Sequence, residues 1–204
     1  MTLVLGIDLS LNGCGLAGDG WADTITPPAP PKRDKTWRSM SDDERAQATL
    51  DYRHRRLQHV TGAIRDRYIA TAPRLVVLEG MAYDAFDTDR QLAGLAWNVR
   101  HSLWRLGIAY ACVPPSTLKQ FATGKGDASK AQMVAAAKAE FPWFDGDDNA
   151  ADALWLCSMG YVALGSPLIR PLPAWRAKTV AKCQWPDLEP YRAAEAVATT
   201  GGIA

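Results

Sequence analysis

Three acidic residues occupy places in the sequence where apolar side chains are expected. Asp8 lies within the apolar run LVLGIDLS, Glu79 ends the run RLVVLE, and Asp152 opens a segment whose next residues are nearly all apolar. A buried carboxylate without a partner is strongly unfavourable. Turn amides, an arginine and a helix N-terminus could satisfy the three acids separately. A single shared cation accounts for all three more economically.

The chemistry of these side chains indicates which cation they would bind. Carboxylate oxygens without His or Cys companions favour Mg²⁺, or alternatively Mn²⁺. Carboxylates that hold two such ions can position water and phosphate for in-line hydrolysis of a phosphodiester. We therefore expect Asp8, Glu79 and Asp152 to be catalytic residues that bind two divalent ions in each active site.

A fourth ligand is expected just before Asp152, and the spacing allows two candidates. Asp148 precedes Asp152 by four residues and Asn149 precedes it by three, so a continuous helix places both beside it. If the helix begins at Ala150 instead, Asn149 is its N-cap and has a purely structural role. An anion suits a site with two divalent cations better than an amide does. Asp148 is therefore predicted to be catalytic and metal-binding.

Four segments of the chain resemble those of RuvC-type Holliday-junction resolvases. They occur in the family's order and span residues 3 to about 162: VLGIDLSLNGCGLA, LVVLEG, VPPSTLKQFATGKGDASKAQMV and NAADALWLCSMG. The resemblance implies an RNase H-like fold, a homodimer, dependence on Mg²⁺ and paired nicking of four-way DNA junctions. It also implies that Lys119 and Lys130 contact DNA at the scissile region, with Lys125 making a looser contact to the backbone.

The chain departs from the family pattern at two places near the acids. The family carries an aromatic residue shortly after its second acid, for which Tyr83 and Phe86 are both candidates here. Asn149 stands where the family often has an acid or a histidine. Cleavage activity is therefore better supported by the sequence than specificity for junctions.

The pattern of apolar residues, prolines and glycines predicts a single α/β domain, with a mixed central sheet flanked by helices. Strands are expected over 2–10, in the glycine-rich segment that follows, and over 74–79 and 108–113. Helices are expected over 42–68, 88–106, 115–121, 129–140 and 150–164. The nuclease domain is predicted to cover residues 1–164, with a Pro-rich loop inserted near 24–36. Residues 165–204 form a partly irregular C-terminal extension with a short helix at 188–198.

Composition limits the other possibilities. The 204 residues carry 23 basic and 22 acidic side chains, so DNA binding must come from a local patch rather than from overall charge. Four cysteines without CxxC pairs fit buried thiols in a reducing compartment. With neither a signal peptide nor a bilayer-spanning run in the sequence, we expect no membrane association and a cytoplasmic location, in a bacterium or a phage-infected host.

Several interpretations of the whole chain remain open. The chain can be a junction-resolving endonuclease, a nuclease of the same fold for other branched DNA or RNA, or a junction-binding protein that does not cleave. The TGKGDASK segment lacks the spacing of a phosphate-binding P-loop, so a DNA-facing loop competes with an ordinary turn. Trp97 and Trp104 share one helix face and could form a dimer surface. The sequence identifies no partner helicase.

Overall fold

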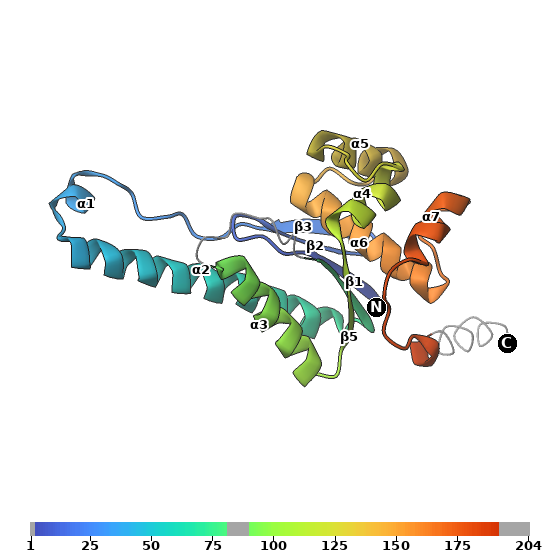
Figure 1. Ribbon diagram of the computed structural model, residues 1–204, viewed down its shortest axis with the longest axis horizontal. Coiled ribbons are helices and arrows are strands. Elements are labelled where there is room, and N and C mark those ends of the chain that lie inside the picture. Colours follow the sequence, from blue (N-terminus) through green and yellow to red (C-terminus); the bar gives the residue numbers. More distant parts are fainter. Residues whose placement is uncertain (1–2, 81–89, 192–204) are drawn as a thin grey trace.

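The computed structural model describes residues 3–80 and 90–191, and its centre is a five-stranded mixed sheet (Figure 1). The strands are β1 (Val4–Asp8), β2 (Cys14–Gly18), β3 (Trp21–Ile25), β4 (Leu75–Glu79) and β5 (Ala109–Val113). Their order in the sheet is β3-β2-β1-β4-β5. β1, β2 and β3 pair antiparallel in sequence order, whereas β4 lies parallel to both β1 and β5. This is a mixed central sheet, as the sequence predicted.

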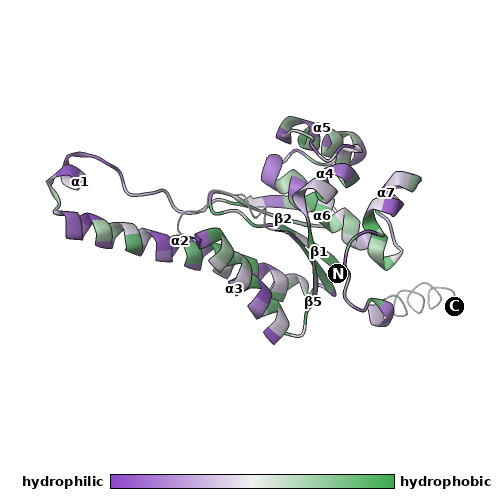
Figure 2. Cartoon of the chain, in the orientation of Figure 1, coloured by the Kyte–Doolittle hydropathy of each residue, from purple (hydrophilic) through white to green (hydrophobic). Residues whose placement is uncertain are grey.

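Helices cover both faces of the sheet (Figure 1). They are α1 (Lys35–Ser39), α2 (Asp42–Thr71), α3 (Gln91–Arg105), α4 (Pro115–Thr123), α5 (Lys130–Glu140), α6 (Asp148–Leu164) and α7 (Ala174–Val180). One apolar core lies between the sheet and α4, α5 and α6, and the other lies between the sheet and α2 and α3. Figure 2 shows the resulting contrast, with apolar colours on the sheet and α6 and mainly polar colours along α2. Within the described residues, no helix is long and apolar enough to span a membrane.

Alternation along the strands decides which face each side chain meets. In β1, Val4 belongs to the core on the α6 side, whereas Leu5 and Ile7 belong to the core on the α2 side. The same period of two places Asp8 on the α6 side. In β4, Val77 faces α6, so Glu79, two residues later, faces α6 as well.

Two glycines let α6 approach the sheet unusually closely. A Cβ atom added at Gly6 in β1 would lie 2.0 Å from the carbonyl oxygen of Ala153. One added at Gly15 in β2 would lie 1.9 Å from the carbonyl oxygen of Asn149. Any side chain at either position would push the helix away. The backbone of α6 therefore rests directly on β1 and β2, which brings the start of the helix to the end of β1.

The structure corrects several expected elements. The sequence predicted one strand after β1, but the chain forms two, because Asp19 and Gly20 make a tight turn that returns β3 along β2. The irregular Pro-rich stretch is accordingly shorter than 24–36: its first residues, Thr24 and Ile25, pair with β2, and its last residues enter α1. α3 begins at Gln91, α4 extends to Thr123, and α6 begins at Asp148 rather than near 150. The helix expected over 188–198 lies mainly outside the described residues.

The C-terminal extension contains a helix, α7, that the sequence did not predict. It is attached to α4 through the buried guanidinium of Arg176, which donates hydrogen bonds to the carbonyl oxygens of Phe121 (3.0 Å) and Ala122 (3.1 Å). These carbonyls belong to the last turn of α4, where no intrahelical partner is available to them. Arg176 also forms an ion pair with Glu140 of α5, at 2.8 Å. The extension thereby fixes the ends of two helices.

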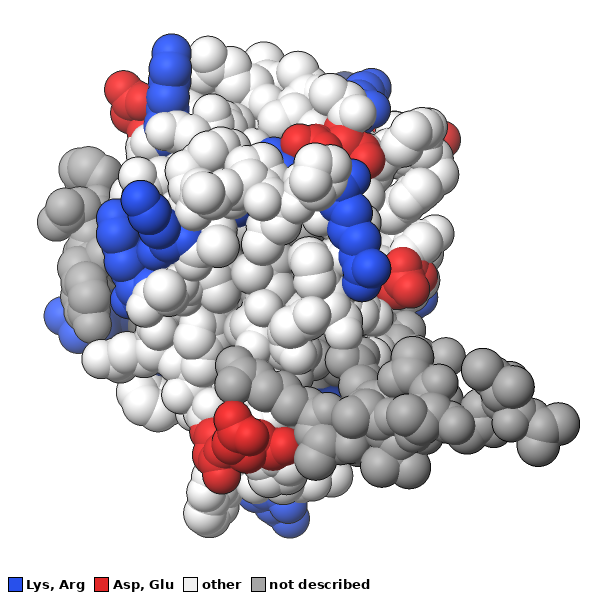
Figure 3. All heavy atoms as spheres, turned by 90° about the vertical axis from the view of Figure 1, so that its right-hand side faces the viewer, with Lys and Arg blue, Asp and Glu red and all other residues white. Residues whose placement is uncertain are grey.

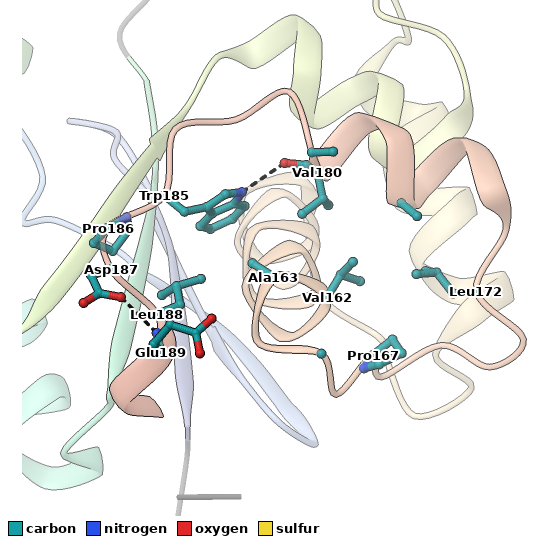
Figure 4. A pocket seen from close by; sticks show the side chains of 13 residues that line it. Val162, Ala163, Pro167, Leu172, Val180, Trp185, Pro186, Asp187, Leu188 and Glu189 are labelled. Carbon is teal, nitrogen blue, oxygen red and sulfur yellow. Dashed lines mark hydrogen bonds between the residues drawn. The ribbon is translucent and has the colours of Figure 1, made fainter. Parts of the chain in front are cut away.

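A largely apolar cavity of about 650 Å³ lies between the C-terminal end of α6, α7 and the segment after it (Figure 4). Val162, Val180 and Leu188 line it, and the indole of Trp185 donates a hydrogen bond to the carbonyl oxygen of Val180 at 2.9 Å. The predicted catalytic acid of α6, Asp152, lies near the opposite end of that helix. This cavity therefore does not contain the predicted active-site residues.

Candidate active site

The strand register brings the first two predicted acids together. β1 and β4 are parallel neighbours in which Ile7 pairs with Leu78, so Asp8 and Glu79 follow side by side at the same edge of the sheet. Both face α6, and the carboxyl groups of Asp8 and Glu79 are close enough to share a hydrogen bond. Asp8 is buried, with 6% of its surface exposed. A hydrogen bond between two carboxyl groups requires that one of them keeps its proton.

α6 contributes the third acid. Asp152 lies in the second turn of this helix, close enough to Asp8 and Glu79 for their negative charges to interact. Its Oδ1 atom is shielded from solvent and has no hydrogen-bond partner among the described residues. An acceptor buried without a donor is unfavourable. The structure therefore leaves one carboxylate oxygen in the centre of the acidic cluster that needs a cation or a donor.

Burial raises the pKa values of all three carboxyls, and the charges of neighbouring carboxylates raise those of Asp8 and Asp152 further. Burial is the larger cause of the strongly raised pKa of Asp8, followed by the negative charge of Glu79. Burial also raises the pKa of Glu79. The pKa of Asp152 is raised to about 7, first by burial and then by the charges of Glu79 and Asp148. The cluster thus keeps protons at a pH where isolated carboxyls are ionised.

Two of the three predicted DNA-binding lysines lie beside the acids. Lys130, the first residue of α5, forms an ion pair with Asp148, which raises the lysine pKa. Its positive charge also acts on Asp8, Glu79 and Asp152. Lys119 of α4 acts on Glu79 and Asp152. The cluster therefore has negative carboxylates at its centre and two ammonium groups at its margin.

The start of α6 decides the roles of the residues before Asp152. Asp147 is the N-cap: its Oδ1 accepts hydrogen bonds from the amide of Ala150 (2.9 Å) and from the hydroxyl of Thr24 (2.6 Å). The alternative in which the helix begins at Ala150 with Asn149 as its cap is therefore wrong. Sequence reasoning missed Asp147, although Asp is a preferred N-cap residue, because several acids are crowded there.

Asp148 and Asn149 point to different neighbours. Asp148 lies one helical turn before Asp152 and interacts electrostatically with it. The side-chain amide of Asn149 lies next to Gly13, in the turn between β1 and β2, where an added Cβ would be 3.0 Å from its Nδ2. Of the two candidates for a fourth ligand, Asp148 is therefore the one whose charge reaches the acidic cluster.

The remaining predicted residues are placed as follows. Lys125 is exposed in the loop between α4 and α5, and no contact joins it to the acids. Tyr83 and Phe86 lie outside the described residues. Trp97 and Trp104 of α3 are 65% and 71% exposed, whereas Trp155 is fully buried in the core. All four cysteines are free.

The donor chemistry of the cluster fits a divalent cation of the Mg²⁺ type. Asp8, Glu79 and Asp152 supply only oxygen atoms, and one of these, Asp152 Oδ1, has no partner. No three acidic, His or Cys side chains in the described ranges are already spaced as a closed metal site. The carboxyl groups of Asp8 and Glu79 are paired with each other instead. A bound cation would compete with this pair and, at Asp148, with the ion pair to Lys130.

Comparison with solved structures identifies the architecture. The chain superposes on RuvC of Thermus thermophilus with a TM-score of 0.52 and 17% sequence identity, over 80% of this chain and 97% of that one. The chain has the RuvC fold. The same Thermus RuvC in complex with a Holliday junction substrate gives a TM-score of 0.53 and 18% identity, over 82% and 98% of the two chains. The yeast mitochondrial Holliday junction resolvase Ydc2 gives a TM-score of 0.40 and 13% sequence identity, over 94% of this chain and 82% of that one.

Neither a protein-family model nor a curated protein matches the sequence. The likeness to RuvC is consequently one of fold. Almost all of the Thermus RuvC chain is covered, while about a fifth of the present chain lies outside the superposition. This chain therefore contains the RuvC fold together with additional segments.

Proposed function

We propose that the chain is a divalent-metal-dependent endonuclease that resolves four-way DNA junctions. The observation that carries this proposal is the cluster of the buried Asp8 with the partly buried Glu79 and Asp152, which have raised pKa values and an oxygen atom that lacks a partner. A fold that needed only stability would not assemble mutually repelling carboxyls at one sheet edge. The choice of a branched DNA substrate is supported by the RuvC fold, which has been solved in complex with a Holliday junction substrate.

The proposed roles follow from the positions of the side chains. Asp8, Glu79, Asp152 and Asp148 would hold the metal, most simply two ions. Bound divalent ions supply an activated water and stabilise negative charge on the phosphate that is cleaved. Asp8 and Asp152 must first lose their protons to become ligands, and the orphaned Oδ1 of Asp152 then gains a partner. Lys119 and Lys130, at the margin of the cluster, would bind the phosphates beside the cleaved bond.

The proposal distinguishes Asp148 from Asn149. Asp148→Ala should nearly abolish Mg²⁺-dependent cleavage, because it removes an anion adjacent to Asp152. Asn149→Ala should keep most of the activity. The opposite pattern would assign Asn149 to the metal site and leave the ion pair with Lys130 as the only role of Asp148.

Paired nicking requires two active sites, and we propose that they come from a twofold dimer. Trp97 and Trp104 give α3 a large exposed apolar surface, as expected for an interface. Light scattering at tens of micromolar protein tests this. A monomer that still cuts junctions in matched pairs would overturn the dimer.

One experiment tests the function as a whole. Purified protein with Mg²⁺ is incubated with a four-way junction, a flap, a linear duplex and a structured RNA, in parallel. Symmetric nicks in the junction alone are the expected result. Preferential cutting of flaps or RNA would place the chain among nucleases of the same fold with another substrate. Retardation of the junction without cleavage would make it a binding protein.

A further inference from the structure

One part of the molecule contributes nothing to either core. Residues 26–56, which we name the arm, comprise the Pro-rich segment, α1 and the N-terminal half of α2, and none of them is buried. The buried residues of α2 begin only at Val60. At a rise of 1.5 Å per residue, α2 extends about 27 Å from Val60 back to its first residue, Asp42. In Figure 1 the arm projects well beyond the sheet, on the side opposite to the N-terminus and α7.

The arm and the candidate active site lie at the same end of the sheet. β1 and β4 both run away from the N-terminal end, and Asp8 and Glu79 are their last residues. α2 runs antiparallel to β4, so its N-terminal half continues past the edge at which the two acids lie (Figure 1). The acids face α6 and α2 covers the opposite face, so DNA held at the acids would reach the arm by passing around this end of the sheet.

The first half of the arm is basic and its charges are not neutralised. Lys32, Arg33, Lys35 and Arg38 are exposed, and none has a carboxylate partner among the described residues. Three of the nearby acids have other partners, and one of them, Asp42, forms an ion pair with Arg45. Asp34 caps α1 by accepting the amide of Trp37 at 3.1 Å, and Glu44 completes the capping box of α2 with Ser41.

These basic residues adjoin a pocket of about 250 Å³ between the Pro-rich segment and α2. Arg33, Arg53 and Arg56 contribute to its wall together with the rings of Trp37 and Tyr52. Arg56 is fixed there: it donates a hydrogen bond to Gln91 at 2.6 Å and lies over the Tyr52 ring at 5.3 Å. Its Nε is shielded from solvent and has no hydrogen-bond partner in the described part of the chain. Arginine forks of this kind bind phosphate with defined geometry.

We propose that the arm is a second DNA-binding site that grips the phosphate backbone of a duplex arm leaving the junction. The pocket of Arg33, Arg53 and Arg56 would receive a phosphate, and Lys35 and Arg38 would contact its neighbours. The length of α2 from Val60 to Asp42, about 27 Å, equals that of about eight base pairs at 3.4 Å each. This inference rests on the proposed function, because it takes the DNA to be positioned by the acids.

The test compares binding to junctions of two arm lengths. Affinity is measured by fluorescence anisotropy without divalent metal, over a range of salt concentrations, for junctions with arms of about 20 and about 6 base pairs. Arms of about 6 base pairs span about 20 Å, so they end before the tip of the arm, where α1 and Arg38 lie. Arg33→Ala/Arg38→Ala removes two exposed charges from the arm. The matched control, Lys178→Ala/Lys182→Ala, removes two exposed charges near α7, at the opposite end of the molecule. Figure 3 views the molecule from the side on which α7 lies in Figure 1, and on this face basic and acidic side chains are interspersed among uncharged residues.

For the long-armed junction, the arm variant should bind about tenfold more weakly than wild type. The slope of the logarithm of its binding constant against the logarithm of salt concentration should be smaller in magnitude by about 1.8, because two phosphate contacts are lost. On the short-armed junction the variant and wild type should agree within about twofold, since no contact is left to lose. The control should match wild type on both substrates. Arg56→Lys, which keeps the charge but loses the planar fork, should weaken binding to the long-armed junction.

The two proposals fail in different ways. If wild type binds and cuts junctions but the arm variant retains its affinity and salt slope, the arm inference is wrong and the proposed function stands. Equal losses on long and short arms would also overturn the inference, because they would place Arg33 and Arg38 at the junction centre. If wild type binds neither junction, both proposals fall.

Discussion

The longest helix and the most buried helix of this protein differ in what determines their sequences. α6 buries thirteen of its 17 residues, and its backbone touches the sheet at Gly6 and Gly15. α2 buries three of its 30 residues. In α6, packing specifies nearly every position, so the partly buried Asp152 stands out as a residue retained for another reason. In α2, the core needs only the C-terminal half, so the length of the helix itself requires an explanation. The two candidate functional regions are therefore recognised in different ways: Asp152 is a charged residue in a closely packed helix, whereas the N-terminal half of α2 is a stretch of helix that the core does not require.

The largest effect is expected from neutralising an acid on the α6 side of the sheet. Asp8→Asn should lower strand scission by about a thousandfold or more, because it removes a proposed ligand from the transition state. The variant should still retard a junction in a gel with Ca²⁺, since the arm and the lysines are intact. Asp187→Asn, an exposed acid far from the cluster, is the control. Cleavage by Asp8→Asn near the wild-type rate would refute the assignment of the acidic cluster.

Contact between α6 and the sheet should be the next most sensitive feature. Gly15→Ala places a methyl group 1.9 Å from the carbonyl oxygen of Asn149, so α6 must move. We expect the free energy of unfolding to fall by about 3 kcal/mol or more. Urea denaturation followed by circular dichroism measures this. A loss below about 1 kcal/mol would mean that the helix adapts freely and does not aim Asp152 through close packing.

The raised pKa of Asp152 predicts how stability depends on pH in the absence of metal. Between its ordinary value of 3.8 and about 7, the folded state retains a proton that the unfolded state has released. The free energy of unfolding therefore falls as pH rises through this interval, by up to about 1.4 kcal/mol per pH unit. Asp152→Asn should remove this contribution and make the variant more stable than wild type at pH near 8. Urea titrations in EDTA test it, and equal slopes for the two proteins would contradict it.

The smallest effect is expected in α2. Gly62 lies inside this helix, and an added Cβ would meet no atom within 4 Å. Gly62→Ala should therefore raise the free energy of unfolding by about 0.5–1 kcal/mol, through helix propensity alone. Thermal unfolding compares it with Gly15→Ala, the same substitution at the contact with α6. If Gly62→Ala destabilises the protein, α2 is more closely packed than its exposed surface suggests.

The residues of the candidate site could be found from the sequence because each breaks a local rule. Asp8 and Glu79 interrupt or end apolar strands, and Asp152 begins an apolar helix, so the pattern of residue types alone indicates that charges are buried there. Their adjacency does not follow from that pattern. It depends on the parallel register of β1 and β4 and on the contact of α6 with two glycines, which are long-range features.

The elements that sequence reasoning missed lack a periodic pattern. β3 is a short edge strand with partly exposed side chains, and its hydrogen bonds to β2 decide its structure. α7 has seven residues and follows a proline, and the contacts of Arg176 with α4 stabilise it from a distance. The cap of α6 fell among Asp145, Asp147 and Asp148, where composition alone could not select the capping residue.

The candidate site also constrains when, during synthesis of the chain, its three carboxyls can come together. Asp8 lies near the start of the described chain, Asp152 lies in its last third, and Glu79 lies between them. A ribosome must therefore release almost the whole polypeptide before the three carboxyls can meet. Contacts this distant in sequence form late and slowly during folding. A fragment that ends before α6 lacks Asp152, so under the proposed function it would be unable to cut DNA.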